Sequence, residues 1–599
     1  MDTPQRGFPF THLPKDLPVQ SRLCSRARLN DALLQPTAQA RWRSLAAPLG
    51  IVLAALCYYG SYLSYWFNPH DEGGTGALTA MRLLAGETPI RDVELGYNVG
   101  WFLPIVALFK IGGVNFLLMR AYFFALSTIT ALCGWALVRR LTRNEWLAVG
   151  SGLMLVLFPG SQFKNYIPLL CVANMLCVVN AARAPVAGWR WRVLAGGLVL
   201  GFTLLIRIDL GCLFGLLWLG LLVLRLCDSR VPAGTRLRGS LAALALLCGM
   251  ILATHTPMYF AARAGGYGER FVQQYVGWVR FLGGKTAAVL GKTNSPAAAL
   301  KISGDAPKIT DRSTLPRMDL RQALSFRDAE NSVLFFLTYA PVLLYAVLLG
   351  WAAWFAVCGL RRRDFKLDDP SSLALLALTG SLAVFPQFFF FRPDRPHLSE
   401  FMPGYIVATV CATALIRARW RRVVAGVLVV QFGFFAWFAL EHYSAGTIAA
   451  RMKIKADKRA FFEGANGVRV WVSQKEHKEL EGVRRAVVEH SKPGDWLVCY
   501  PYQPGYNVMT DRPTYERAIY NDNATTNSRW AAETIARMKE KQPAVIVIDD
   551  RAINKVEGSR FSTWAAAVNA HIEAHYKLCA TFDSIKVFAR ETGPEPKQP

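Results

Sequence analysis

The sequence lacks the cysteine spacings that bind metal ions, although it contains twelve cysteines. Most of these cysteines lie within or beside apolar blocks, where cysteine behaves as a small hydrophobic residue. Only Cys499 and Cys579 lie in the more polar C-terminal part of the chain. A disulfide between them would require an oxidising compartment. Two unpaired cysteines in a folded core are the preferred interpretation.

Acidic residues are scarce: 42 Asp and Glu stand against 68 Lys and Arg, and the formal net charge is +26. A charge of this size suggests a nucleic-acid partner. The basic residues, however, fall in short clusters between apolar blocks, as they do in the cytoplasmic loops of membrane proteins. We therefore expect no nucleic-acid partner. A cleavable signal pattern is also lacking, because residues 1–45 are polar and rich in arginine.

Apolar residues, in contrast, make up 53% of the chain, and the mean hydropathy is +0.23. They come in blocks of about 17 to 25 residues, which are long enough to cross a hydrocarbon core of roughly 30 Å as helices. A soluble protein of this length would divide into several domains with polar surfaces. The sequence therefore predicts a polytopic α-helical membrane protein.

Lysine and arginine clusters give the predicted spans a direction. With residues 1–45 in the cytoplasm, the short connections after every second span are cationic, as at Arg139-Arg140. This alternation predicts about eleven spans in residues 46–441, with outer loops at about 68–116 and 261–331 and with residues 442–599 outside the cytoplasm. The predicted spans are 46–67, 117–138, 145–159, 165–182, 193–207, 210–226, 239–260, 332–359, 372–390, 402–416 and 423–441.

Residues 442–599 show the pattern of a small extracytoplasmic α/β domain, in which strand-like runs alternate with helical ones. Asp549-Asp550 follows one of these strands, at an edge where such sheets often bind ligands. A solvated turn is the preferred interpretation of this pair. The predicted strands are 468–472, 496–500 and 544–548, and the predicted helices are 480–490 and 529–541.

Charged residues at membrane level are costly, so they are candidate functional residues. The first such cluster is His70-Asp71-Glu72, directly after the first predicted span. Adjacent carboxylates raise each other's pKa. A general base, or a pair that holds a cation, would explain why both acids lie at a helix exit. A solvated loop that happens to contain two acids is the alternative.

The second cluster contains two arginines and a histidine, Arg392, Arg395 and His397, with Asp394 between them. It directly follows a run of four phenylalanines, residues 388–391. Guanidinium groups bind phosphate through paired hydrogen bonds. The cluster therefore predicts a site for a phosphate whose apolar tail meets the phenylalanines, and an interfacial anchor on lipid headgroups is the alternative.

The third cluster is Arg207 and Asp209, between two apolar blocks. Residues two apart do not face each other on a helix. We therefore expect this pair to break the helix or to have partners on other spans, and a structural buried ion pair is the alternative. Lys164 lies at the same predicted level and is a further candidate contact for phosphate.

The region behind the first span carries a recognisable order of motifs. In sequence these are Asp71-Glu72, the run 77–86, Pro89-Ile-Arg-Asp92, the run 100–105 and Arg120. This order resembles the first outer loop of GT-C glycosyltransferases, which include bacterial relatives of protein O-mannosyltransferases and of lipid A aminoarabinose transferases. Residues 492–495 and 510–512 are similar to the extracytoplasmic domains that follow many such membrane regions. The resemblance covers roughly residues 46–440 in topology.

The resemblance implies functions for individual residues. Asp71 would be the base that deprotonates an acceptor hydroxyl, and Glu72 would orient it or help to hold a divalent cation such as Mg²⁺ or Mn²⁺. Charge chemistry, rather than a family motif, assigns the donor phosphate to the cluster of Arg392, Arg395 and His397, with Lys164 as a further contact. The supporting residues are Asp92, Arg207, Asp209 and Asp394.

The resemblance also implies a reaction, a location and partners. The expected reaction moves a sugar, a hexose or a pentose, from a polyprenyl-phosphate donor to an acceptor hydroxyl, with inversion. It would take place on the outer face of the bacterial cytoplasmic membrane. The partners are the bilayer, the donor lipid and a glycan, lipid or protein acceptor, because the long loop has no recognised inserted domain that would identify the acceptor. A lipid-linked saccharide flippase, for which inverted repeats are lacking, and a non-catalytic envelope assembly protein are the alternatives.

Overall fold

The computed structural model describes residues 38–158, 164–185, 188–289, 329–362, 365–384, 395–413, 458–518, 528–552 and 557–591, with short pieces in 321–325 and 416–433 and residue 521. The side chains of some helical residues within these ranges, among them Asp71, Arg395 and His397, lie outside the described set. The chain divides into two compact units, residues 1–50 and 51–599. The described part of the first unit, residues 38–50, is the beginning of helix α2.

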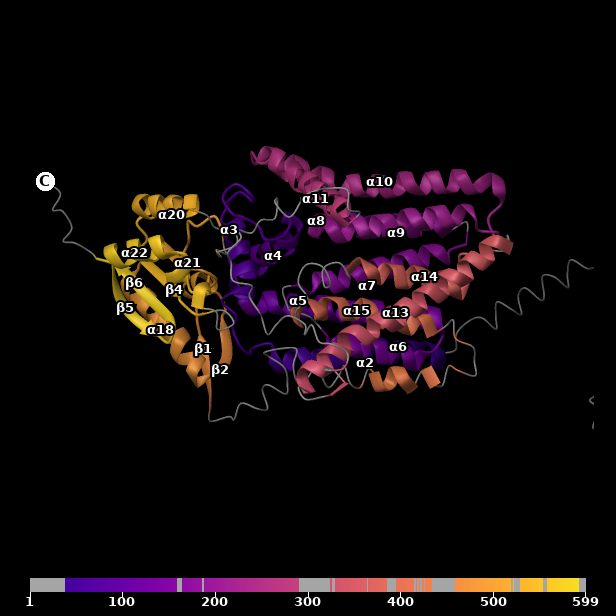
Figure 1. Cartoon of the computed structure of the whole chain (residues 1–599), viewed down its shortest axis with the longest axis horizontal. Coiled ribbons are helices and arrows are strands. Elements are labelled where there is room, and N and C mark those ends of the chain that lie inside the picture. Colours follow the sequence, from indigo (N-terminus) through magenta and orange to yellow (C-terminus); the bar gives the residue numbers. More distant parts are fainter. Residues whose placement is uncertain are drawn as a thin grey trace, which may run out of the picture. The chain divides into compact units, whose positions relative to one another are not determined.

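Long apolar helices dominate the N-terminal two thirds of the chain (Figure 1). Five of them are long and apolar enough to cross a membrane, and six shorter apolar helices accompany them in the described residues. The helices are α2 (Ala38–Tyr62), α4 (Val99–Gly112), α5 (Phe116–Thr142), α6 (Glu145–Leu157), α7 (Tyr166–Ala182), α8 (Trp189–Ile206), α9 (Ile208–Leu226), α10 (Ala233–Ala264), α11 (Gly268–Val289), α13 (Ala329–Arg362), α14 (Pro370–Ser381) with η4 (Leu382–Val384), and α15 (Arg395–Ala412).

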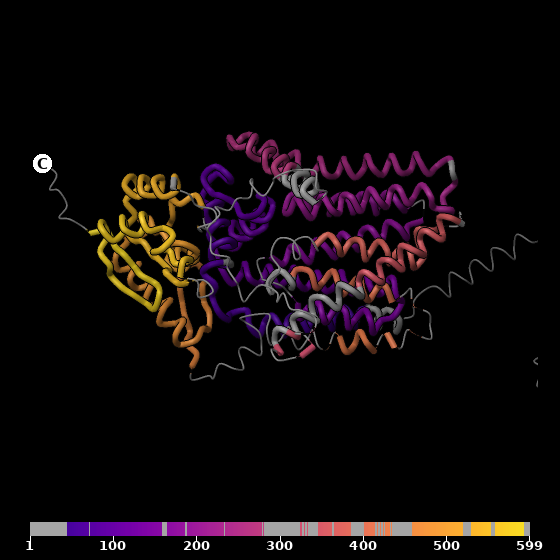
Figure 2. The backbone as a smooth tube through the Cα atoms, in the orientation of Figure 1, coloured from indigo at the N-terminus to yellow at the C-terminus, as the bar shows by residue number. Residues whose placement is uncertain are grey.

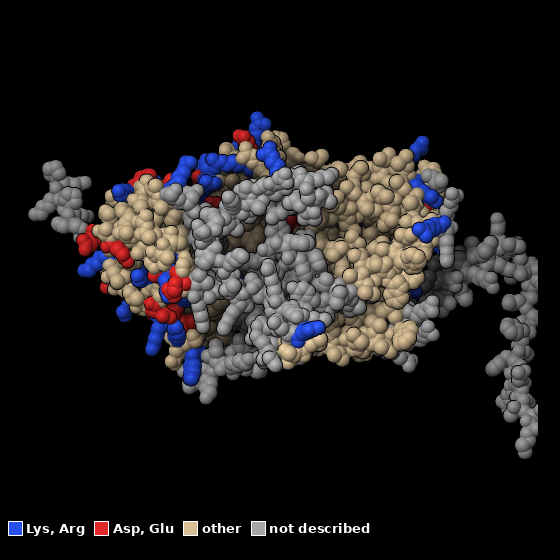
Figure 3. Space-filling model, in the orientation of Figure 1, with Lys and Arg blue, Asp and Glu red and all other residues tan. Residues whose placement is uncertain are grey.

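These helices confirm a multi-pass membrane protein and fall close to the predicted spans. Many large apolar side chains lie on the outside of the helices, as on α9, where Leu216 is 64% exposed and Val223 is 61% exposed. A helix that is apolar all round needs lipid or protein on every side. Figure 3 shows the same pattern over the described helices toward the right of the view, where the surface is uncharged and Lys and Arg side chains gather at its right-hand end. The predicted last span, 423–441, lies mostly outside the described residues, so the number of spans stays a prediction.

Two short helices lie between α2 and α4 in the chain. They are η1 (Asp71–Leu78), which is π-helical, and α3 (Thr79–Leu84). The stretch 100–113, which looks too short for a span, forms the 14-residue helix α4. A Cβ on Gly100 would lie 2.5 Å from the Leu205 carbonyl oxygen, so α4 packs very closely against the end of α8. The indigo part of the tube in Figure 2 shows these segments beside the C-terminal strands.

The C-terminal region contains a hairpin and a mixed four-stranded sheet. The hairpin strands, β1 (Arg459–Glu463) and β2 (Arg469–Ser473), are antiparallel. The sheet has the order β3-β4-β6-β5, in which β3 and β4 are parallel and the other neighbours are antiparallel. Its strands are β3 (Leu497–Tyr500), β4 (Val545–Asp549), β5 (Tyr576–Phe582) and β6 (Ile585–Arg590), and its helices are α18 (Gln474–His490), α19 (Gly505–Thr510), α20 (Ser528–Lys541), α21 (Phe561–Trp564) and α22 (Ala566–His575), with η9 (Glu557–Ser559).

Helices cover both faces of this sheet, which explains the unbroken apolar run of β4. Val545 and Val547 belong to the same core cluster as the buried face of α18. Ile546 and Ile548 point the other way, into a cluster with Met538 of α20 and with residues of α21 and α22. A strand that is buried on both faces has no polar alternation. The predicted strands and helices of this region are therefore confirmed, whereas the sequence patterns missed β1, β5 and β6.

Two smaller expectations about this region concern single residues. Cys499 and Cys579 are both free thiols, on β3 and β5 at opposite edges of the sheet, which confirms the unpaired interpretation. Asp549 accepts hydrogen bonds from Gln503 and Ser584, and Asp550 accepts two from Ser562 at the start of α21. The two acids thus stabilise a strand-to-helix turn, as the preferred interpretation held, but Asp549 is only 7% exposed, so the turn is not solvated at this residue.

Candidate functional site

The segment that follows α2 is paired through its backbone with the C-terminal region. The Trp66 N–H donates to the carbonyl oxygen of Trp471 at 2.9 Å, and the Trp471 N–H donates to that of Ser64 at 2.8 Å. Trp66 has a φ of 60°, which is a strained conformation for a bulky residue. The two bonds hold this strained backbone in front of η1.

The beginning of α19 packs on η1 with almost no space between the two backbones. A Cβ on Gly505 would lie 2.5 Å from Cα and the carbonyl oxygen of Pro69, and a Cβ on Gly74 would lie 2.4 Å from the ring of Pro504. The Gly505 N–H donates to the carbonyl oxygen of Pro69 at 2.7 Å. Glycine is needed at such close approaches. The C-terminal region therefore fixes the position of the segment that contains Asp71.

A buried ion pair joins η1 to α5. Arg120 donates to both carboxylate oxygens of Glu72, with Nε–Oε1 at 3.1 Å and Nη2–Oε2 at 2.6 Å. Its terminal nitrogens also donate to the carbonyl oxygens of Leu63, Tyr65 and Trp66, each at 2.8 Å. The two charged side chains are 1% and 3% exposed. Such a pair is stable only when its donors and acceptors are satisfied, as they are here.

This geometry supports a positioning function for Glu72, because both of its oxygens already bind Arg120. Asp71 precedes it as the first residue of η1, and π-helical segments are rare and frequent at functional sites. The described side chains contain no group of three or more His, Cys, Asp or Glu that could hold a metal ion. The base function of Asp71 and the cation-binding function of both acids stay predictions.

A second cluster of charges, of which Glu400 is buried and the others are largely buried, lies where α7, α8, α9 and α15 begin or end. Lys164, just before α7, forms an ion pair with Glu400 of α15, with Nζ–Oε1 at 3.1 Å. Arg207, between α8 and α9, donates to both oxygens of Asp209, at 2.9 Å for the shortest contact. Arg207 also interacts electrostatically with Glu400 and with Tyr97. The structure therefore brings Lys164, Arg207 and Asp209 together, and their function as contacts for phosphate stays a prediction.

The predicted helix break at Arg207 is confirmed, and it explains how two residues that are two positions apart can pair. Arg207 has extended backbone angles, with φ −150° and ψ 106°, between the last residue of α8 and the first of α9. Because the chain is extended there, the guanidinium can turn back onto the carboxylate of Asp209. The alternative of a buried ion pair describes the same contact.

Aromatic rings connect this second cluster to α5. Tyr97 stacks on Trp101 with ring centroids 4.0 Å apart, and Trp101 meets the edge of Tyr166 at 4.9 Å. The hydroxyl of Tyr166 is 2.9 Å from that of Tyr122, which lies two residues after Arg120. The Glu72–Arg120 pair and the Lys164–Glu400 pair therefore belong to one end of the helical bundle.

Asp92 holds a turn in the first loop. Its carboxylate accepts hydrogen bonds from the backbone of Thr88 at 2.8 Å and from the guanidinium of Arg91 at 2.9 and 2.8 Å. The Arg91 bond lowers the pKa of Asp92 well below its usual value, and the Thr88 bond adds to this. The contact lies within the loop itself and stabilises its shape, and the supporting function of Asp92 in the site stays a prediction.

The cluster at residues 392–397 lies outside the residues whose side chains the structure describes. Arg392 and Asp394 lie outside the described residues. Arg395 and His397 lie in the first turn of α15, but their side chains are outside the described set. Glu400, on the next turn of the same helix, contacts Lys164. The phosphate-binding function of the four residues stays a prediction.

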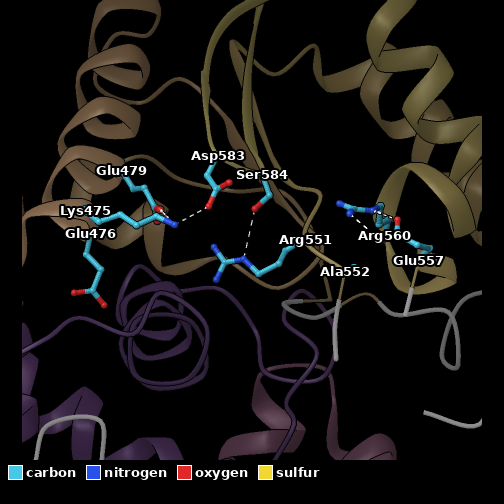
Figure 4. A pocket seen from close by; sticks show the side chains of 9 residues that line it. All are labelled: Lys475, Glu476, Glu479, Arg551, Ala552, Glu557, Arg560, Asp583 and Ser584. Atoms are coloured by element: carbon cyan, nitrogen blue, oxygen red, sulfur yellow. Dashed lines mark hydrogen bonds and ion pairs between the residues drawn. The ribbon is translucent and has the colours of Figure 1, made fainter. Parts of the chain in front are cut away.

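A polar groove leads from the outside of the C-terminal region to the segment before Asp71. Its outer part is a cavity of about 540 Å³, and its inner part, of about 200 Å³, is lined by Trp66–Pro69. Glu476, Glu479 and Arg551 line both parts. Figure 4 shows the lining side chains coming from α18, from the β5–β6 turn and from the segment after β4, with Arg551 near the centre.

The groove contains charges of both signs. Lys475 donates to Asp583 at 2.9 Å, and this bond lowers the pKa of that carboxyl. Partial burial raises the pKa of Glu479. Carboxylates, a guanidinium and the half-buried Trp66 are groups that can bind the hydroxyls and the ring faces of a polar ligand.

Two residues of these ion pairs were assigned no function from the sequence, although each left a signal, and Arg120 was named there only as part of the order of motifs. Arg120 stands inside the predicted span 117–138, where a charge is costly and needs a partner. Glu400 stands just before the predicted span 402–416 and is 1% exposed. Their partners, Glu72 and Lys164, could not be identified because nothing local in the sequence links them.

Comparison with known proteins identifies solved structures that have the same fold. No family model and no curated protein sequence matches the chain. Two crystal structures of ArnT from Cupriavidus metallidurans match it, one in the apo state (TM-score 0.51) and one bound to undecaprenyl phosphate (TM-score 0.50). In each case the identity is 14%, and the match covers 92% of this chain and 98% of the other. The resemblance to GT-C membrane glycosyltransferases is thereby confirmed at the level of the fold.

Proposed function

We propose that the protein is a membrane glycosyltransferase that moves a sugar from a polyprenyl-phosphate donor to an acceptor hydroxyl. The observation that carries the proposal is the pair of largely buried cations, Lys164 (13% exposed) and Arg207 (11% exposed), at the end of an apolar bundle. Cations at that level can bind a lipid phosphate whose chain stays among the helices. A structure of the same fold that has undecaprenyl phosphate bound supports this assignment.

In the proposed reaction, Asp71 takes the proton of the acceptor hydroxyl as that oxygen attacks the anomeric carbon of the sugar. The bond from the anomeric carbon to the phosphate oxygen breaks, and its electron pair leaves with the lipid phosphate. Lys164 and Arg207 stabilise the charge that grows on this phosphate, together with Arg392, Arg395 and His397. Attack opposite to the leaving group inverts the anomeric centre.

Glu72 acts through Arg120 in this proposal. The pair fixes the carbonyl groups of Leu63, Tyr65 and Trp66 and the first turn of η1, so it sets the position from which Asp71 reaches the acceptor. A divalent cation on Asp71 and Glu72 would require the bonds from Arg120 to open. Asp209 and Glu400 orient the two cations, and Asp92 shapes the loop above them.

The acceptor enters from outside through the groove between Arg551 and the segment Trp66–Pro69. This arrangement supports an outer-face reaction, with the C-terminal region outside the cytoplasm and the bundle in the bacterial cytoplasmic membrane. The acceptor is a polar molecule with free hydroxyls, such as a glycan or the headgroup of a lipid.

The test uses the full chain in lipid nanodiscs with a panel of radiolabelled polyprenyl-phosphate sugars. Asp71→Asn should lower transfer by about 10²–10⁴-fold, the range typical of a lost general base, and should leave the thermal midpoint unchanged. Glu94→Gln is the matched control, because Glu94 is an exposed acid of the same loop, and it should keep full activity. A flippase would retain its flux after Asp71→Asn. The absence of transfer or hydrolysis with every donor would overturn the proposal.

A further inference from the structure

A second cationic site lies at the opposite ends of the same helices. Arg120 lies near the beginning of α5, Lys164 before α7 and Arg207 after α8. Arg140 lies near the end of α5, Arg183 directly after α7 and Arg192 in the first turn of α8. The latter three arginines line a cavity of about 490 Å³ together with Cys177, Asn180 and Ala195.

Hydrogen bonds hold these three arginines in place but use only part of each guanidinium. Nη1 of Arg140 donates to the side-chain oxygen of Asn180, Nη1 of Arg183 donates to the carbonyl oxygen of Arg140 at 2.7 Å, and Nη1 of Arg192 donates to that of Asn180 at 2.9 Å. Nε and Nη2 of all three arginines make no hydrogen bond to the described residues. These two nitrogens form the fork that binds a phosphate through two parallel bonds.

The charges of the site are not balanced by acids among the described residues that line it. Arg183 and Arg192 act on Arg140 as like charges. Two acids next to these helix ends in the chain have other partners: Glu145 binds Arg139 at 2.9 Å, and Asp228 binds Arg230 at 2.7 Å. Three cations that converge on one cavity repel one another, and an anion would relieve this repulsion. The positive-inside rule explains why cations occur in these connections, but not why three of them share a cavity.

Two exposed tryptophans indicate the level of the site relative to the membrane. Trp146, in the first turn of α6, is 87% exposed, and Trp191, beside Arg192, is 75% exposed. Tryptophan is enriched at the level of lipid headgroups. An anion held at this level is more readily supplied by a membrane lipid than by the solvent, and basic pockets between helices on the cytoplasmic side bind such headgroups.

We infer that Arg140, Arg183 and Arg192 form a binding site for the phosphate of an anionic phospholipid headgroup, on the membrane face opposite to the proposed transferase site. The lipid's phosphate oxygens would accept bonds from the free forks of the guanidiniums. Cys177 and Ala195 line the apolar side, where the acyl chains would begin. The inference does not depend on the proposed function.

The test replaces the three guanidinium groups by lysine ammonium groups, which keeps the positive charges but removes the paired N–H donors. The full chain carrying Arg140→Lys, Arg183→Lys and Arg192→Lys is compared with the unaltered chain in neutral detergent, and phosphatidylglycerol is titrated in while the thermal midpoint is followed. We expect phosphatidylglycerol to raise the midpoint of the unaltered chain and to bind the triple variant about tenfold more weakly, because lysine cannot form the paired bonds. Arg190→Lys, which changes an exposed arginine outside the cavity, should behave like the unaltered chain.

A parallel titration with inorganic phosphate identifies the source of the anion. It should leave the midpoint unchanged at matched phosphate concentration; an equal rise with inorganic phosphate would overturn the lipid assignment. An equal response of the triple variant and the unaltered chain would overturn the site. If the triple variant does not fold, Arg192→Lys alone is used, and a response identical to that of the unaltered chain would again overturn the inference.

Discussion

Replacing Arg120 by methionine should strongly destabilise the protein, because it leaves a buried carboxylate without a partner. Arg120 makes two bonds to Glu72 and three to backbone carbonyl oxygens, and both charged side chains are at most 3% exposed. Breaking a buried ion pair by removing one partner costs about 3–5 kcal/mol of the free energy of unfolding. The three carbonyl oxygens left without donors add to this, and protonation of the freed carboxylate reduces it.

The matched control lies on the same helix. Arg139 forms an ion pair with Glu145 at 2.9 Å, but the two side chains are 40% and 42% exposed. Exposed pairs of this kind contribute about 0–1 kcal/mol. Arg139→Met should therefore leave the protein nearly as stable as before, while Arg120→Met lowers the thermal midpoint of the purified full chain, followed by tryptophan fluorescence.

A second substitution separates positioning from catalysis by Glu72. In the double variant Arg120→Met with Glu72→Gln, the uncompensated charge is gone, so part of the lost stability should return. If Glu72 were instead a base or a metal ligand with no structural function, Glu72→Gln alone would abolish transfer and leave the midpoint unchanged. Equal midpoints for the unaltered chain and for Arg120→Met would refute the reasoning from burial.

Three further predictions concern the C-terminal region. Gly505→Ala should cost about 1–3 kcal/mol, because its Cβ would lie 2.5 Å from the backbone of Pro69; an unchanged thermal midpoint and unchanged transfer would contradict the tight packing. Burial raises the pKa of Glu479 above its ordinary 4.5, so the stability that this group contributes is lost as the pH rises from about 4.5 through the raised value. Glu479→Gln should remove that loss, which denaturation curves at several pH values would show as a smaller fall; parallel curves would contradict it. Cys499 and Cys579 are free thiols, so a reducing agent should not change the thermal midpoint, and a fall on reduction would reveal a disulfide.

Hydropathy and charge were sufficient to predict most of the helical architecture. Apolar blocks such as 117–138 and 210–226 became α5 and α9 within a few residues, because a helix that faces lipid must be apolar along its whole length. Helix α4 was harder to predict from its pattern. It is only 14 residues long, with Pro104 inside it, and it is stabilised by packing on α8 rather than by spanning the membrane on its own.

The strands, like the helices, differ in how far their own residues predict them: some are evident from local composition, and others depend on contacts with distant segments. β4 is an unbroken apolar run, which its own composition reveals. β5 carries Lys577 on an edge strand with several exposed side chains, and it is a strand because it pairs with β6. Its conformation therefore depends on a partner rather than on its own residues.

The contacts that fix the candidate site are mostly of the kind that a sequence cannot reveal. Trp66 binds Trp471, Pro69 binds Gly505 and Glu94 binds Arg517 through backbone groups, which every residue carries and which leave no compositional signal. Asp71 could be recognised as an unusual acid at a helix exit, but its place depends on these three bonds and on the Glu72–Arg120 pair. The C-terminal region is thus part of the support of the first loop. A substitution on its surface toward η1 should alter transfer even though it lies far along the chain from Asp71.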